Sequence, residues 1–178
     1  ITAAQGDANQ RVAEIARSFD AWDLRGVAFL DPYGPNLEWA TVQALADTRK
    51  FDVIINFPLD MAINRLIKRD GDIPENWGQM LDKCFGNHDW HDLAFEEAEP
   101  NLFGETKFTK RTGTASRLLS LYHGQLEQAF GHVSKPSLVQ NTKGHPLYYL
   151  IWASANRRGL PIADHILGLG DKVKVPRG

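Results

Sequence analysis

The sequence predicts an α/β fold with a mostly parallel sheet and flanking helices, and three observations support this class. Two short segments, residues 27–31 and 51–56, are almost continuously apolar, which is typical of strands buried on both faces. Each is followed by a segment whose apolar residues recur at helical spacing. Turn residues separate these segments. Because parallel strands need a crossover helix, the alternation predicts right-handed βαβ units.

Length and composition fit one soluble globular domain spanning residues 1–178. The chain is 43% apolar and 24% charged, with a net charge of −2 and a pI of about 6.3. This balance predicts neither disorder nor a general affinity for nucleic acid, and no apolar run is long enough to span a membrane. Cys84 is the single cysteine, so we expect no internal disulfide and a reducing, cytoplasmic location.

The elements follow one another in a regular order. A short strand-like opening breaks at Gly6, and Asp7 or Asn9 can cap a helix that runs to about Phe19. Residues 70–110 carry scattered aromatic residues among acids, glycines and prolines, which indicates a helical or irregular insertion or lid. The remaining expected elements are strands at 27–31, 51–56, 137–140 and 147–154, and helices at 37–48, 61–67, 114–130 and 160–167.

Three polar motifs coincide with the ends of predicted strands. They are GDAN at residues 6–9, DPYG at residues 31–34 and NFP at residues 56–58. Ligands of open α/β sheets bind at the carboxyl ends of the strands, where loops and helix N-termini converge. The sequence therefore predicts that these three motifs surround one binding site.

DPYG is the most informative of the three motifs. Asp31 ends a buried strand, where a carboxylate is costly unless it is paired or meets a ligand. Pro32 fixes its own φ, and Tyr33 presents an aromatic face. Together they can accept hydrogen bonds from an exocyclic amine and stack on the base that carries it. The alternative is that Asp31 caps the following loop or helix and Tyr33 packs.

The other two motifs each allow a structural and a functional interpretation. The Asp7 carboxylate can accept a hydrogen bond from an adenine amino group, with Asn9 or the Ala8 amide nearby, or it can simply cap a helix. Residues 56–58 can contact a substrate, or they can form a turn with Pro58 at the first position of the next helix.

Further clusters of polar residues have weaker functional interpretations. His88 and His91 lie among acids, but a zinc site needs more ligands, so we expect a polar surface turn and no metal. Arg157 and Arg158 follow a strand and are expected in a solvated turn. A local basic cluster compatible with a nucleic-acid backbone comprises Lys107, Lys110, Arg111 and Arg117.

Four blocks resemble the three-Cys-motif partner protein family, a bacterial group with a class I methyltransferase-like fold: GDAN, VAFLDPYGPNLEWATVQALA, FDVIINFPLDMAINR and HPLYYLIWASANRRG. The resemblance covers most of the chain and implies a Rossmann-like sheet that binds S-adenosylmethionine. GDAN would follow the third strand of that fold, so Asp7, Ala8 and Asn9 would contact the cofactor, together with Asp31.

The resemblance also suggests a substrate class. DPYG would occupy the place of the (D/N)PP(Y/F) motif of amino-methyltransferases and is similar to the DPFG of tRNA guanine-N2 methyltransferases. It therefore implies catalytic roles for Asp31, Pro32 and Tyr33 and a nucleic-acid amine as substrate. The residues implied to contact the substrate are Tyr33, Gly34, Asn56, Phe57 and Pro58.

One part of the family pattern is missing. A class I methyltransferase needs a first strand ending in a glycine-rich turn and a second ending in a ribose-binding acid. The sequence shows neither, and no segment of strand–Gly-x-Gly–helix form replaces them. We therefore expect a Rossmann-like fold incomplete at its N-terminus, preceded by ~60–100 residues, or else a remnant without cofactor.

Three functional hypotheses follow. The leading one is an S-adenosylmethionine-dependent methyltransferase acting on an exocyclic amine of a nucleic-acid base. The alternative is a non-catalytic Rossmann-like interaction module that acts with a three-Cys-motif protein partner in a defence or mobile-element system. The third is a nuclease or hydrolase that uses His88, Asp89 and His91.

Overall fold

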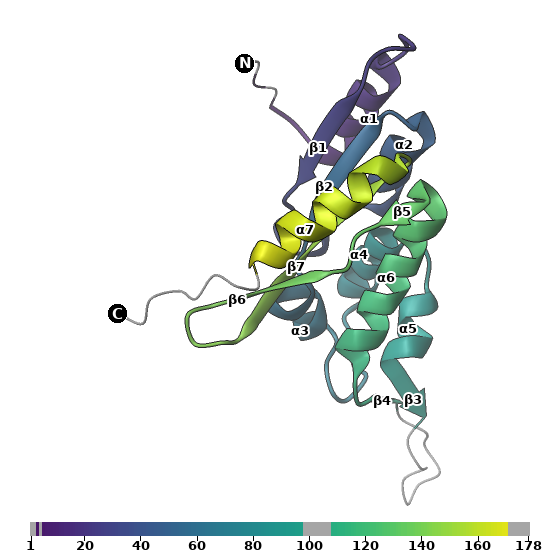
Figure 1. Cartoon of the computed structure of the whole chain (residues 1–178). Coiled ribbons are helices and arrows are strands. Elements are labelled where there is room, and N and C mark those ends of the chain that lie inside the picture. Colours follow the sequence, from purple (N-terminus) through teal and green to yellow (C-terminus); the bar gives the residue numbers. More distant parts are fainter. Residues whose placement is uncertain (1–2, 4, 98–107, 171–178) are drawn as a thin grey trace, which may run out of the picture.

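A five-stranded mixed sheet runs through the middle of the fold (Figure 1). The computed structural model describes residues 3, 5–97 and 108–170. The strands lie in the order β1–β2–β7–β5, and β6 also pairs with β7. Their bounds are β1 Gly26–Leu30, β2 Phe51–Phe57, β5 His132–Val133, β6 Ser137–Gln140 and β7 Pro146–Ser154.

One strand runs against the others. β1 and β2 are parallel, whereas β7 is antiparallel to β2, β5 and β6. Four strands therefore share one direction, and the central position of β7 makes three of the four pairings antiparallel. The expected parallel unit is confirmed for β1, α2 (Trp39–Thr48) and β2. Most strands of the sheet point in the same direction, as expected for a mostly parallel sheet. The expectation is wrong for the pairing of neighbouring strands, which is mostly antiparallel.

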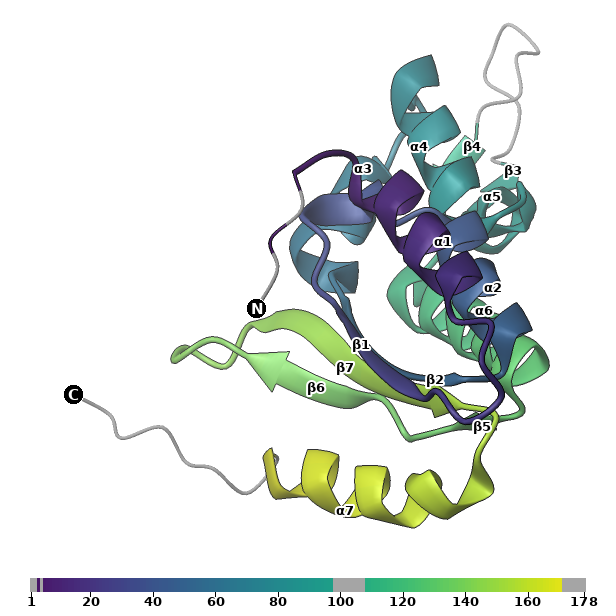
Figure 2. The ribbon, with the colours of Figure 1, turned by 90° about the horizontal axis from the view of Figure 1, so that it is seen from above.

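Helices cover the two faces of the sheet unequally (Figure 2). α1 (Ala8–Ser18), α2 and α6 (Thr114–Phe130) lie on one face, and α7 (Leu160–Gly170) lies on the other. The main core fills the space between β2 and the helices of the first face. Fully buried members of that core include Val42, Leu45, Val53, Ile55, Leu118 and Leu126.

The segment at residues 70–110 adds a helical layer beside α6. It contains α4 (Glu75–Phe85), α5 (Asp89–Ala94) and a small two-stranded sheet of β3 (Phe95–Glu97) and β4 (Phe108–Lys110). Phe85 and Trp90 are fully buried. This segment therefore contributes to the core as well as extending the surface.

The chain after β2 departs from the expected single helix. It forms a π-helical turn, η2 (Leu59–Ile63), followed by a short α3 (Asn64–Leu66). The Pro58 carbonyl accepts hydrogen bonds from the N–H groups of Ala62 and Ile63, at 3.1 and 3.2 Å. The second of these closes a wide i→i+5 turn, a geometry that recurs at functional sites.

Several other expectations can be compared with the structure. The helix at 114–130 and the strand at 137–140 occur with the expected bounds. The strand expected before Gly6 lies largely outside the described residues, as does Lys107. In the part of the chain that is described, no helix is both long and apolar enough to cross a membrane.

Candidate ligand-binding site at the ends of β1 and β2

Two of the three polar motifs meet where β1 and β2 end. The parallel register places Leu30 beside Ile55, so the next residues, Asp31 and Asn56, are neighbours. The Asn56 side-chain Nδ2 donates a hydrogen bond to Asp31 Oδ1 at 2.5 Å. Asp31 therefore contacts the neighbouring strand end and does not cap the following helix.

Asn56 contributes a further polar atom to this point. Its side-chain Oδ1 is buried and accepts no hydrogen bond from any described residue. A buried acceptor without a partner costs about 1–3 kcal/mol. Asn56 thus orients the Asp31 carboxylate with its Nδ2, while its Oδ1 stays buried without a partner among the described residues.

The DPYG loop presents its tyrosine to solvent. Gly34 adopts a φ of +69°, a left-handed conformation that favours glycine, and begins the 3-10 turn η1 (Gly34–Asn36). Asn36 Nδ2 donates to the Tyr33 carbonyl at 2.5 Å and closes the loop. The Tyr33 side chain is 91% exposed. It does not pack into the protein, so its ring is open to a ligand.

In the GDAN motif, Asp7 is the N-cap of α1. Its Oδ1 accepts a hydrogen bond from the Asn9 N–H at 2.9 Å. The capping interpretation is therefore confirmed for Asp7. Within the described chain this is the one hydrogen bond of the carboxylate, so Oδ2 remains open for a ligand.

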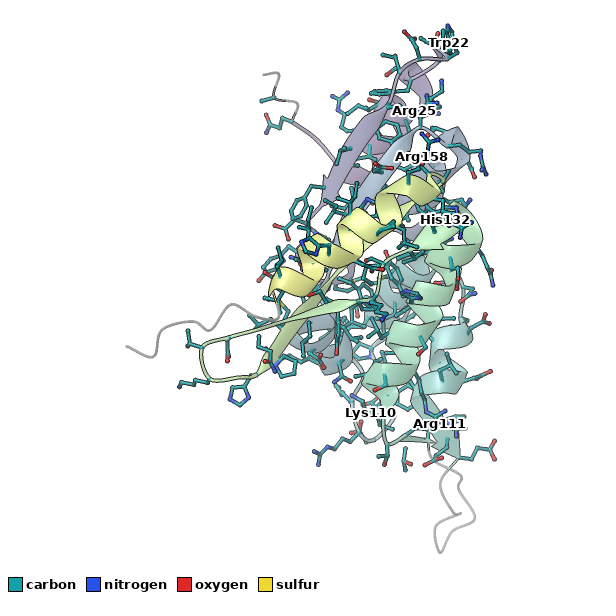
Figure 3. All side chains as sticks on the ribbon, in the orientation of Figure 1. Trp22, Arg25, Lys110, Arg111, His132 and Arg158 are labelled. Atoms are coloured by element: carbon teal, nitrogen blue, oxygen red, sulfur yellow. The ribbon has the colours of Figure 1, made fainter. Side chains whose placement is uncertain are left out.

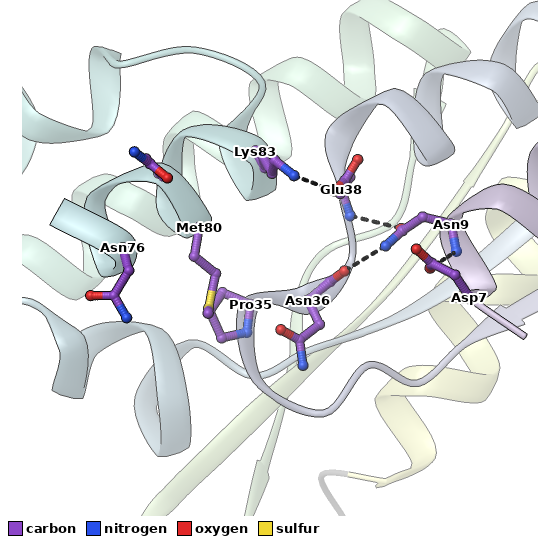
Figure 4. Close-up of a pocket in the computed structure, with 9 residues that line it drawn as sticks. Asp7, Asn9, Pro35, Asn36, Glu38, Asn76, Met80 and Lys83 are labelled. Atoms are coloured by element: carbon purple, nitrogen blue, oxygen red, sulfur yellow. Dashed lines mark hydrogen bonds and ion pairs between the residues drawn. The ribbon is translucent and has the colours of Figure 1, made fainter.

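Asn9 ties the start of α1 to the loop after β1 (Figure 4). Its Nδ2 donates to the Asn36 carbonyl at 2.9 Å. Its Oδ1 accepts from the Glu38 N–H at 3.0 Å and from Thr41 Oγ1 at 2.8 Å. Both side-chain polar atoms are thus engaged within the protein, so Asn9 positions the site, and the second hydrogen of Nδ2 is the group it can still offer a ligand.

Two cavities adjoin this Asn9 clamp. One, of about 400 Å³, is mainly apolar and lies between α1 and the DPYG loop. The other, of about 410 Å³, is more polar and lies between the α1 N-terminus and α4 (Figure 4). Both volumes are in the range of small-molecule sites. The first is lined by Asp7, Ala8, Asn9, Val12, Phe29, Leu30, Asp31, Pro32, Tyr33, Asn36, Leu37 and Thr41.

The polar cavity has a mixed lining. Lys83 Nζ and Glu38 Oε1 form an ion pair at 3.1 Å across one wall. Asn76 and Met80 of α4 lie across the cavity from Asp7 and Asn9 (Figure 4), and Gln79 of α4 also lines it. Asp7, Asn9 and Asn36 line both cavities, so a ligand longer than one cavity could extend past the α1 N-terminus.

Three residues of the predicted substrate set lie away from these cavities. Phe57 is buried and stacks on Tyr122, with ring centroids 4.1 Å apart and planes 9° from parallel. Pro58 is buried and precedes the π-helical turn. Gly34 is half-buried in the loop. The structure therefore brings Asp7, Ala8, Asn9, Asp31, Pro32 and Tyr33 together, with Asn56 behind them.

Sequence reasoning missed a second polar group near the end of β2. Burial raises the pKa of Asp60, and the Lys110 charge opposes this shift. The pKa of Tyr149 is also raised, by burial first and by the Asp60 charge second. Perturbed acids of this kind mark candidate functional sites. The signal that could have found Asp60 is its place two residues after the NFP motif.

Two members of the expected basic cluster, Lys110 and Arg111, are used inside the fold, whereas Arg117 is exposed. Lys110 Nζ donates to the Asn64 carbonyl, to Asn64 Oδ1 and to the Ile67 carbonyl, at 2.7–2.9 Å. Burial and the Arg69 charge lower the pKa of Lys110, and the Asp60 charge raises it. Arg111 pairs with Glu96 at 3.2 Å. Lys110 and Arg111 therefore anchor β4 and do not form a free basic surface.

The two histidines have partners within the protein, and the cysteine is buried. Asp82 Oδ1 contacts His88 Nδ1 and accepts from Trp90 Nε1, both at 2.7 Å, and the His88 and His91 rings stack at 5.0 Å. Among the residues that the structure describes, no three His, Cys, Asp or Glu side chains are grouped to hold a metal ion. Cys84 is buried, and burial raises its pKa to about 12.

No family model matches the chain, and neither a curated protein nor a solved structure matches it. The resemblance to the three-Cys-motif partner family is therefore carried by its sequence motifs alone.

Proposed function

We propose that this chain is an S-adenosylmethionine-dependent methyltransferase acting on an exocyclic amine, with a nucleic-acid base as the favoured substrate. One observation carries the proposal. The Asp31 carboxylate, oriented by Asn56, lies at the ends of β1 and β2 beside the exposed Tyr33 and lines a cavity of about 400 Å³. This combines a hydrogen-bond acceptor, an aromatic face and a pocket at the edge where α/β sheets bind ligands.

The residues present fit the adenosine part of the cofactor. The cavity is mainly apolar, as a purine needs, with Val12, Leu30 and Pro32 in its wall. Asp7 Oδ2 is open to accept from an adenine amino group, and Ala8 lies beside it. The Asn9 side-chain oxygen already accepts two hydrogen bonds, and Nδ2 donates one, so the second Nδ2 hydrogen is what this side chain can offer a ligand.

The chain's own residues would bind and orient the target amine. Asp31 Oδ1 is engaged by Asn56, so Oδ2 can accept a hydrogen bond from an amine N–H. A nitrogen held in this way keeps its lone pair directed away from the carboxylate. Tyr33 can stack on the base that carries the amine. When bound, S-adenosylmethionine supplies an electrophilic methyl group, and holding both reactants in position provides most of the rate.

Calorimetric titration with S-adenosylhomocysteine tests the cofactor part of this proposal. We expect saturable binding tighter than about 1 mM. Asp7→Ser removes the carboxylate, so it should weaken binding of S-adenosylhomocysteine. Serine at this position can still cap α1, so the helix should remain intact. Lys143→Ala, at an exposed position in the β6–β7 loop, is a matched control and should bind normally. The titration uses the full-length protein, and absence of binding by it up to that concentration would refute the proposal.

A second candidate is a protein-interaction module, and one observation favours it. Large apolar side chains are exposed on β1 and α7, among them Val27, Phe29, Ile162 and Ile166. Exposed apolar surface of this extent is typical of interaction sites. If the chain acts as a protein-interaction module, Asp31→Ala should leave its activity with the partner protein intact. Charged substitutions at Val27 or Ile162 should abolish that activity. Activity that depends on Asp31 favours the methyltransferase.

A further inference from the structure

Three positively charged side chains follow β2, on α3 and on the residues directly after it. Residues 61–69 contain Arg65, Lys68 and Arg69 and no acid; these three residues are called the α3 cations. Arg65 and Arg69 are exposed, and neither side chain forms a hydrogen bond or an ion pair with a described residue. Lys68 Nζ lies over the Trp77 ring, 5.7 Å from its centroid, and this contact helps to hold its charge in place.

A fourth positive charge, that of Lys110, lies behind the α3 cations. Its three hydrogen bonds go to the Asn64 carbonyl, Asn64 Oδ1 and the Ile67 carbonyl, which are all neutral acceptors. Burial and the Arg69 charge lower the pKa of Lys110, and the Asp60 charge raises it. Within residues 5–97 and 108–170, however, Lys110 forms no ion pair. The region around α3 therefore keeps positive charge that an anion can balance.

The α3 cations belong to the same edge of the sheet as the candidate site. β1 and β2 end at this edge, and η1 of the DPYG loop packs against η2. The exposed Tyr33 comes directly before η1, and α3, which carries Arg65, comes directly after η2. Figure 3 shows Lys110 toward one end of the molecule and Arg25 and Arg158 toward the other. The α3 cations are therefore the positive charges that follow the candidate site most directly.

The polar cavity on the α1 side of the DPYG loop has the opposite charge. Its charged lining residues are Asp7, Glu38 and Lys83, which leave a net charge of −1. A polyanion that reaches the candidate site is repelled by this lining and attracted by the α3 cations. Charge complementarity therefore favours a path from Tyr33 toward α3 over a path toward α4.

We propose that the α3 cations bind the phosphates of a single-stranded nucleic acid whose target base stacks on Tyr33. An arginine guanidinium can bind phosphate oxygens through two parallel hydrogen bonds. Such contacts position a strand without reading its sequence. A single strand fits because an exocyclic amine inside a duplex is not accessible until its base leaves the stack. This inference rests on the proposed function, since the strand would carry the amine substrate.

Fluorescence anisotropy with labelled oligonucleotides tests the inference on the full-length protein without cofactor. The probes are a single-stranded RNA and a single-stranded DNA of about 12 nucleotides, and the DNA duplex of the same sequence. We expect saturable binding of a single strand, with an affinity that falls as the salt concentration rises. The duplex should bind more weakly, because its paired bases are not free to stack on Tyr33.

Neutral substitutions separate phosphate contacts from stacking. Arg65→Gln and Arg69→Gln should each reduce the slope of log affinity against log salt concentration by about 0.7, because one fewer phosphate is neutralised. The double variant should bind at least about tenfold more weakly. Tyr33→Ala should weaken binding at least about fivefold and leave the salt slope unchanged. Arg158→Gln, at an exposed arginine of η3 (Arg157–Gly159), is the matched control and should bind normally.

Circular dichroism should show that every variant is folded, since the replaced arginine side chains have no partner within the described residues. Failure of both single strands to bind would overturn the inference, as would a duplex that binds as tightly as the single strand. An unchanged affinity and salt slope in the double variant, an unchanged affinity in Tyr33→Ala, or an equal loss in Arg158→Gln would overturn it too.

The calorimetric titration with S-adenosylhomocysteine contains no nucleic acid, so the two ideas can fail separately. Cofactor binding without strand binding would overturn the role of the α3 cations and leave the cofactor site intact. Strand binding with the expected variant effects but without cofactor binding would support the α3 cations and refute the methyltransferase.

Discussion

Replacing Asn9 by alanine tests how the candidate site is held together. Asn9 makes three hydrogen bonds to the segment that follows β1, with the Asn36 carbonyl, the Glu38 N–H and Thr41 Oγ1. These bonds join residues 27 to 32 positions apart in the sequence. Asn9→Ala removes all three at once and leaves the backbone carbonyl of residue 9, which Thr41 Oγ1 contacts at 3.5 Å.

The magnitude can be worked from these contacts. Each hydrogen bond contributes about 0.5–1.5 kcal/mol, and a buried group left without a partner costs more. The Thr41 side chain belongs to a residue only 3% exposed, whereas the Asn36 carbonyl can turn to water. We therefore expect Asn9→Ala to lower the free energy of unfolding by about 2–3 kcal/mol. Asn9→Asp keeps the two acceptor contacts and should cost about half as much.

Urea unfolding followed by circular dichroism measures this loss. The transition midpoint should fall for Asn9→Ala while the slope stays the same, because the surface exposed on unfolding is unchanged. Asp7→Ala is the matched control in the same motif, and loss of its cap should cost about 1 kcal/mol. A loss below about 0.5 kcal/mol for Asn9→Ala would refute the assignment of Asn9 as the positioning residue.

Three further predictions concern the core and the titrating groups. Phe57→Ala should destabilise the protein by about 3–5 kcal/mol in the same urea assay, because it leaves a cavity against Tyr122; a loss under 1 kcal/mol would place the ring outside the core. Cys84 should react with a thiol reagent only on unfolding, since burial raises its pKa to about 12; fast labelling of folded protein would contradict this. Burial raises the pKa of Asp60 above 3.8, so the folded state binds this proton more tightly than the unfolded chain does. Stability should then fall as pH rises from about 4 through the folded pKa, and Asp60→Asn should remove this part of the pH dependence; identical profiles for both proteins would count against it.

Much of the fold could be predicted because apolar patterns are local. The helix Thr114–Phe130 has a clear helical period and ends at Gly131, and the structure ends it there. The direction of β7 could not be predicted, because a continuous apolar run reads the same for a parallel and an antiparallel strand. The π-helical turn after Pro58 likewise depends on which carbonyl accepts each hydrogen bond, and the apolar spacing does not specify this.

The candidate site divides in the same way. The meeting of Asp31 and Asn56 could be predicted, since parallel strand ends share one edge of a sheet. The clamp made by Asn9 could not, because its partners are distant in sequence. The burial of Phe57 could have been predicted from its position in the strand. Residues of a strand alternate between faces, so Phe57 points to the core with Val53 and Ile55, while Asn56 points away.

Nuclear magnetic resonance titration with S-adenosylhomocysteine tests the central claim most directly, because it shows where a ligand binds. The account predicts saturable shifts of the backbone amides of Ala8, Leu30 and Tyr33 and of the Asn56 side-chain amide, all at the ends of β1 and β2. Amides of α7, on the opposite face of the sheet, should stay unchanged (Figure 2). Shifts confined to α7, or no shifts at millimolar ligand, would contradict a cofactor site at these strand ends.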